Sequence, residues 1–127
     1  MKKVISTTNA PGAIGPYSQG TEINGMVFTS GQIAIDPSTG NLIDGGVEEE
    51  AHMVMKNLSA VLEAAGTNFD HVVKTGIFLA DMDDFAKVNA VYESYLSEGT
   101  GYPARETVQV AKLPKGVKVE ISMIAVK

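Results

Sequence analysis

Two charged residues near the end of the sequence, Arg105 and Glu120, offer the clearest chemistry. Arg105 follows Pro103 in the segment YPARETVQV (102–110), whose alternating and β-branched residues predict a strand. A guanidinium is a planar fork that can bind a carboxylate through two hydrogen bonds. A carboxylate such as Glu120, held in a partly dry pocket, has a raised pKa and can take a proton from water. An ordinary surface or interface salt bridge is the simpler interpretation, and spacing alone favours it.

Three further polar residues occur where a site could use them. Tyr17 lies on a Gly-Pro loop (GPYS), and Ser30 closes a predicted hairpin strand immediately before Gly31. Asn89 interrupts the apolar positions of a predicted helix, as a buried hydrogen-bond partner would. Taken singly, each of these residues is more typical of a structural role.

Composition excludes several classes of site. The 127 residues contain no cysteine, so disulfides, thiolate metal sites and a cysteine nucleophile are ruled out. His52 and His71 lack companions at a metal-ligand spacing, and no glycine-rich loop precedes a helix as a phosphate site requires. We therefore expect no metal and no cofactor.

Charge and hydropathy bear on the expected partners. The net charge of −5 argues against binding nucleic acid through phosphate neutralisation. The N-terminal segment MKKVISTTNAPG has no apolar signal-peptide core, and no run approaches the roughly 18 apolar residues of a membrane span. We expect a cytoplasmic protein that binds neither nucleic acid nor membranes.

The periodicity of the sequence predicts one α+β domain over residues 1–127, with element order β-ββ-α-β-α-ββ. The turn signal Asn24-Gly25 predicts a hairpin over 21–31, and Asp83 or Asp84 is expected to cap the second helix. The remaining elements are strands over 3–7, 71–80, 102–110 and 117–126 and helices over 47–65 and from Asp83 or Asp84 to 96.

The last predicted strand has an unusual second face. One face, from Val117 to Ala125, is apolar throughout; the other begins polar and becomes apolar at Ile124 and Val126. A sheet with two helices on one face should have a solvent-exposed, polar opposite face. The apolar end therefore indicates that another copy of the chain covers it, so we expect a homo-oligomer.

Several segments together resemble one known family. They are GPYSQG (15–20), SGQI (30–33), DHVVKTGIFLADMDDFAKVN (70–89), YPAR (102–105) and VEI (119–121). In this order, and over nearly the whole chain, they resemble the Rid family of reactive-intermediate imine deaminases (RidA/YjgF type). The resemblance favours a ligand carboxylate over a salt bridge as the partner of Arg105.

The resemblance implies a chorismate-mutase-like fold with a six-stranded sheet and two helices on one face. It also implies a homotrimer, with the sheets facing inward and active sites between subunits. The implied activity is hydrolysis of 2-imino acids, typically 2-iminobutanoate and 2-iminopropanoate, to 2-oxo acids and ammonia. Such imines are released by pyridoxal-phosphate enzymes and damage other enzymes of that kind.

Residue by residue, the resemblance implies that Arg105 holds the substrate carboxylate and Glu120 activates water. Tyr17, Ser30 and the Gly31 backbone would line the site, and Asn89 would lie at its rim.

Two residues depart from the family pattern. Many relatives have cysteine where this chain has Thr107, which would keep a small polar group at the pocket wall. Glu106 replaces a small residue, and strand alternation predicts that it points away from Arg105. The alternative is a non-enzymatic member of the family that binds small molecules or acts as a regulatory or chaperone-like protein. Other members cut RNA, which the net negative charge of this chain argues against.

Overall fold

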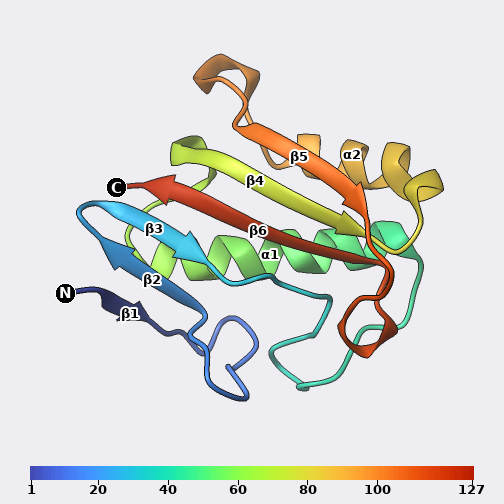
Figure 1. The fold of residues 1–127 in the computed structure, drawn as a ribbon, viewed down its shortest axis with the longest axis horizontal. Helices are drawn as coiled ribbons and strands as arrows, with labels where there is room; N and C mark the ends of the chain where they lie inside the picture. Colours follow the sequence, from blue (N-terminus) through green and yellow to red (C-terminus); the bar gives the residue numbers. More distant parts are fainter.

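A single six-stranded sheet carries two helices on one face in the computed structural model, which describes residues 1–127 (Figure 1). The strand order across the sheet is β1-β2-β3-β6-β4-β5. The strands are β1 (Lys3–Ile5), β2 (Gly20–Ile23), β3 (Met26–Thr29), β4 (Val72–Leu79), β5 (Ala104–Gln109) and β6 (Val119–Val126). The helices are α1 (Val47–Ala64) and α2 (Phe85–Ser94). The predicted α+β order is confirmed, with most strand ends one or two residues shorter than predicted.

Strand pairing follows from the connections between the strands. The β2–β3 hairpin turns at Asn24 and Gly25, both with positive φ, as the sequence predicts for a two-residue turn. β6 lies in the middle, antiparallel to both β3 and β4. The chain crosses from β4 through α2 to β5, so these two strands are parallel and β5 forms one edge of the sheet.

Helix α1 begins and ends where its sequence signals predict. The Glu49 side chain accepts a hydrogen bond from the Gly46 N–H at 3.0 Å, and three glutamates occupy the first turn, where the helix dipole favours them. Past the other end, Gly66 has φ 82°, a conformation that glycine adopts without strain. The apolar face of the helix packs against the sheet.

The start of α2 differs from the prediction. Asp84 is the residue before Phe85, but its side chain makes no capping bond. Asp81 instead accepts a hydrogen bond from the Asp83 N–H at 2.9 Å and caps a short 3₁₀ turn, Met82–Asp84, that leads into the helix. The capping carboxylate therefore lies earlier than expected, because an additional turn precedes the helix.

Alternation along β6 divides the sheet into a buried and an open face. Val119, Ile121, Met123 and Ala125 are buried beneath the helices and belong to a core of 22 buried residues. Residues of opposite parity, including Glu120 and Ile124, are only partly buried on the face that carries no helix. The two faces predicted for this strand are confirmed.

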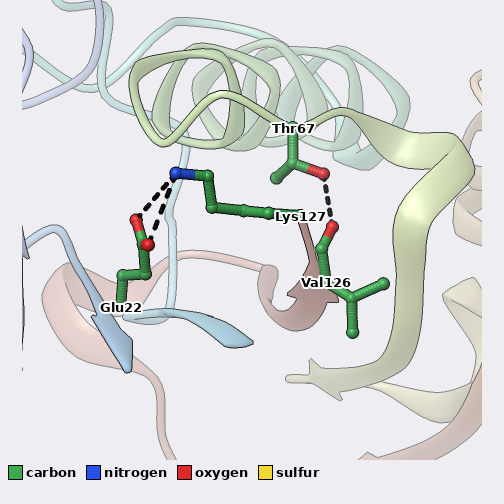
Figure 2. A network of polar contacts seen from close by, with 4 residues as sticks. All are labelled: Glu22, Thr67, Val126 and Lys127. Atoms are coloured by element: carbon green, nitrogen blue, oxygen red, sulfur yellow. Dashed lines mark hydrogen bonds and ion pairs between the residues drawn. The ribbon is translucent and has the colours of Figure 1, made fainter. Parts of the chain in front are cut away.

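Polar contacts hold the C-terminal end of β6 in place (Figure 2). Thr67 is buried, with 7% of the residue exposed, and its hydroxyl donates a hydrogen bond to the Val126 carbonyl at 2.7 Å. The Lys127 ammonium lies 3.4 Å from the Glu22 carboxylate of β2. The strand that carries Glu120 is thus anchored to the loop after α1 and to the hairpin.

We expect the substitution Thr67→Val to lower the free energy of unfolding by about 1 kcal/mol, because it removes the donor of a part-buried hydrogen bond to the Val126 carbonyl. Urea denaturation of the two proteins measures the difference. Thr8→Val is the matched control, since Thr8 is exposed and its side chain makes no hydrogen bond. Equal losses in both variants would show that the Thr67 bond contributes nothing specific.

Candidate functional site

Glu120 lies on the open face of the sheet, opposite Phe78 of β4. Its side chain lines a cavity of about 480 Å³ between the N-terminal loop, the segment after β3 and the turn before β6. Burial raises the pKa of the Glu120 carboxyl above its ordinary value. This half-buried carboxylate therefore suits the role of a general base.

Gly31 allows the Glu120 side chain to occupy its position. A Cβ atom built on Gly31 would lie 2.4 Å from Oε2 of Glu120, closer than atoms approach in real proteins. Any other residue here would displace the carboxylate. The family resemblance implies that Gly31 lies in the site, and the structure adds this steric requirement.

Tyr17 and Ser30 line the same cavity as Glu120. The Ser30 hydroxyl donates a hydrogen bond to the Ser18 carbonyl at 2.5 Å. The Tyr17 hydroxyl accepts a long hydrogen bond, 3.4 Å, from the Ile14 N–H. The structure thus brings together four of the predicted residues: Tyr17, Ser30, Gly31 and Glu120.

Gln19 is a positioning residue that the sequence analysis did not identify. Its buried carboxamide accepts a hydrogen bond from the Thr7 N–H and donates to the carbonyls of Thr7, Ala10 and Pro11. These bonds fix the N-terminal loop as a wall of the Glu120 cavity. The sequence feature that could have revealed this role is a glutamine directly after the residues Gly-Pro-Tyr-Ser.

Asn57 fixes a second wall of this cavity. It is 1% exposed in the middle of α1, and its amide donates to the carbonyls of Ile33 and Ile35 at 3.3 and 2.9 Å. Asn57 is a further functional residue missed from the sequence; the feature that could have revealed it is a polar residue on the apolar side of a predicted helix.

Arg105 lies on the other face of the sheet, beside α2. Its Nη1 donates a hydrogen bond to Oδ1 of Asn89 at 2.5 Å, and its guanidinium carbon is 5.4 Å from the ring centres of both Phe85 and Tyr92. Arg105 and Asn89 line a second cavity, of about 350 Å³. Arg105 makes no ion pair within the chain, so an intramolecular salt bridge is excluded as its role.

One chain does not bring Arg105 and Glu120 together. Arg105 of β5 pairs with Thr75 of β4, and Thr75 in turn pairs with Met123 of β6. The Met123 side chain faces the helices, so Arg105 lies on that side of the sheet as well. Glu120 lies three residues away along β6 and faces the opposite side. The two charged groups therefore occupy separate cavities on opposite faces of the sheet.

The neighbours of Arg105 follow the alternation of β5. Glu106 points to the open face and forms an ion pair with Lys74 at 3.2 Å, which confirms its predicted orientation. Thr107 lies on the Arg105 face, but it lines neither cavity. Its Oγ1 is buried without a hydrogen-bond partner.

The histidines do not form a metal site. Nδ1 of His52 lies 2.8 Å from the Tyr95 hydroxyl, so this exposed histidine links α1 to the end of α2. His71 contacts Asn68. No three side chains of a kind that binds metals gather together, and no helix is long and apolar enough to cross a membrane.

Comparison with known proteins decides the family. The family described as Endoribonuclease L-PSP matches residues 7–127. A crystal structure described as a protein of unknown function of the conserved Rid protein family, from Yersinia pestis, matches with a TM-score of 0.96 and 49% identity over all of both chains. The chain belongs to the Rid family.

Other Rid proteins that match have named activities or ligands. A protein from Mus musculus named 2-iminobutanoate/2-iminopropanoate deaminase is 52% identical over all of this chain and 93% of its own length. A protein of the same name from Salmonella typhimurium is 49% identical over 100% of this chain and 99% of its own. The crystal structure of E. coli TdcF with bound serine matches with a TM-score of 0.93 and 46% identity over 98% of each chain.

We expect the substitution Gly31→Ala to move Glu120 out of its partly dry position and towards water. Because burial raises the Glu120 pKa in the native protein, the variant's pKa should fall towards the ordinary value. Carboxyl ¹³C chemical shifts followed across pH measure it. The control Gly12→Ala lies in the same cavity, where a Cβ meets nothing within 4 Å, and should leave the pKa unchanged. An unshifted Glu120 pKa in Gly31→Ala would contradict the steric argument.

Proposed function

We propose that this Rid protein hydrolyses 2-iminobutanoate and 2-iminopropanoate to the corresponding 2-oxo acids and ammonia. The observation that most supports this proposal is the half-buried position of Glu120. The raised pKa of its carboxyl suits a general base, and Ser30 and Tyr17 line the same cavity. Full-length relatives about half identical to this chain carry this activity in their names. The protein would work in the cytoplasm.

Glu120 activates the water in this mechanism. As the water oxygen bonds to C2 of the protonated imine, Glu120 takes its proton and the C=N electron pair moves to nitrogen. The protonated Glu120 then returns that proton to the nitrogen. The C–N bond then breaks with its electron pair leaving on ammonia, while the C2 hydroxyl becomes the carbonyl of the 2-oxo acid and gives its proton to the Glu120 carboxylate, which passes it to ammonia or water. Since the imine is already electrophilic, the protein needs only to orient it, position the water and supply the base.

Arg105 binds the substrate carboxylate. Asn89, Phe85 and Tyr92 hold the guanidinium at the edge strand, and no carboxylate of its own chain occupies it. Because Glu120 faces the other side of the sheet, the Arg105 of one site comes from a neighbouring copy. Asn89 lies at the rim of the Arg105 cavity, whereas Thr107 is on the same face of β5 but outside that cavity.

A homotrimer provides that neighbour. The open face presents large apolar side chains to solvent in the single chain, with Phe28, Phe78 and Val108 each about two-fifths exposed. The exposed edge of β5 also has unpaired backbone groups, which proteins ordinarily cover. Three copies with their open faces inward would bury these side chains and bring β5 of one copy to the Glu120 cavity of the next.

RNA cleavage is a second candidate because the matching family is described as Endoribonuclease L-PSP. The net charge of −5 disfavours it, since RNA binding depends strongly on cationic contacts to phosphates. A binding-only regulator is a third candidate, which would need Arg105 but tolerate loss of Glu120.

The deciding experiment generates 2-iminobutanoate with a threonine dehydratase in the presence of semicarbazide, which competes for the imine. We expect the native protein to suppress the semicarbazone. Arg105→Ala should lose suppression and the binding of 2-oxobutanoate. Glu120→Gln should lose suppression by about 100-fold or more, as expected for removal of a general base, while still binding 2-oxobutanoate.

Glu63→Gln is the control, because Glu63 is an exposed carboxylate on α1, away from the open face and outside both cavities, and its loss should leave the suppression unchanged. A native protein without any effect on the semicarbazone would contradict the proposal. Binding of 2-oxobutanoate without turnover would favour the regulator. Metal-independent cleavage of single-stranded RNA by the native protein and by Glu63→Gln would favour the ribonuclease.

A further inference from the structure

The cavity that contains Glu120 has one cationic side chain among its lining residues, that of Lys115. The ammonium group of Lys115 makes no ion pair within the chain. The other cation expected to bind substrate, Arg105, lies in a different cavity on the opposite face of the sheet. Lys115 is therefore the only positive charge that a chain places in its own Glu120 cavity.

The backbone holds Lys115 in an unfavourable conformation. Its φ of 56° and ψ of 17° are in the left-handed region, which a residue with a Cβ rarely adopts. Lys115 is the middle residue of the turn Pro114–Gly116, and the Val117 N–H closes this turn on the Pro114 carbonyl at 3.2 Å. Such strain persists where the surrounding structure fixes it, and it gathers at functional sites.

Buried side chains fix this turn at both ends. Leu113 before it and Val117 after it are 4% and 5% exposed. Lys115 itself is exposed, so its side chain reaches solvent from a fixed backbone position at the cavity. A lysine on a fixed turn places its charge at the cavity more consistently than a lysine on a loose loop.

The substrate of the proposed reaction carries a carboxylate, and the protein carries a net charge of −5. A negatively charged protein repels an anionic ligand unless a local positive charge attracts it. We propose that Lys115 is a second carboxylate-binding residue, which draws the 2-imino acid into the Glu120 cavity before Arg105 of the neighbouring copy holds it. The inference rests on the function proposed above and adds a residue for substrate capture.

The test compares Lys115→Asn with Lys115→Arg and Lys112→Asn. Asparagine tolerates the left-handed conformation, so Lys115→Asn removes the charge without unfolding the turn. Lys112 is a nearby exposed lysine that does not line the cavity, which makes it the matched control. Melting temperatures of all the variants establish that they are folded.

We expect Lys115→Asn to raise KM for the imine about three- to tenfold with kcat unchanged, because a single charge that steers a ligand changes capture and not chemistry. Lys115→Arg should keep the native KM, and so should Lys112→Asn. The difference between native protein and Lys115→Asn should shrink as salt rises to about 0.5 M, where charges are screened within a few ångströms. A lower kcat at unchanged KM, or equal effects of Lys115→Asn and Lys112→Asn, would overturn the proposal.

Calorimetric binding of 2-oxobutanoate separates this inference from the proposed function. If the native protein turns over no imine but binds 2-oxobutanoate more tightly than Lys115→Asn does, the deaminase assignment fails and the role of Lys115 stands. If native protein and Lys115→Asn bind it equally, or neither binds it, the role of Lys115 is wrong.

Discussion

Alternation along a single strand is the constraint on which the site depends. Glu120 and Ile121 are neighbours in β6, and their side chains face opposite sides of the sheet because successive side chains of a strand always do. Ile121 belongs to the core beneath the helices, so Glu120 must lie on the open face. The same rule places Arg105 on the helix side of β5. Packing of the core thereby separates the two groups that the proposed chemistry needs.

Neighbouring residues hold both Glu120 and Arg105 in fixed positions. The carboxylate fits only because residue 31 has no side chain, and the loops around it are tied down by the buried amides of Gln19 and Asn57. Partial burial keeps its pKa raised. Arg105 is positioned equally well by Asn89 and two aromatic rings, but on the other face. Under the proposed function, each chain would supply two preorganised half-sites.

Local rules predicted much of this structure from the sequence. The Asn24-Gly25 turn, the extent of α1 and the two faces of β6 follow from turn chemistry and periodicity, which act within a few residues. The orientation of Glu106 followed from alternation alone. These features could be predicted without knowing which helices and strands pack against one another.

Contacts between distant residues could not be predicted in this way. The bond between His52 and Tyr95, the four bonds of the Gln19 amide and the cap by Asp81 depend on how loops and helices meet in space. The pairing register of β4 with β5 and β6, which could not be read from the sequence, puts Arg105 and Glu120 on opposite faces of the sheet.

The most direct test of this account mixes two inactive variants, Arg105→Ala and Glu120→Gln, unfolded and refolded together. If each site takes Arg105 from one copy and Glu120 from its neighbour, random mixing in equal amounts restores about a quarter of the native sites, although neither variant alone is active. Native mass spectrometry verifies that mixed assemblies form. Mixed assemblies without any recovered imine hydrolysis would contradict a site shared between copies.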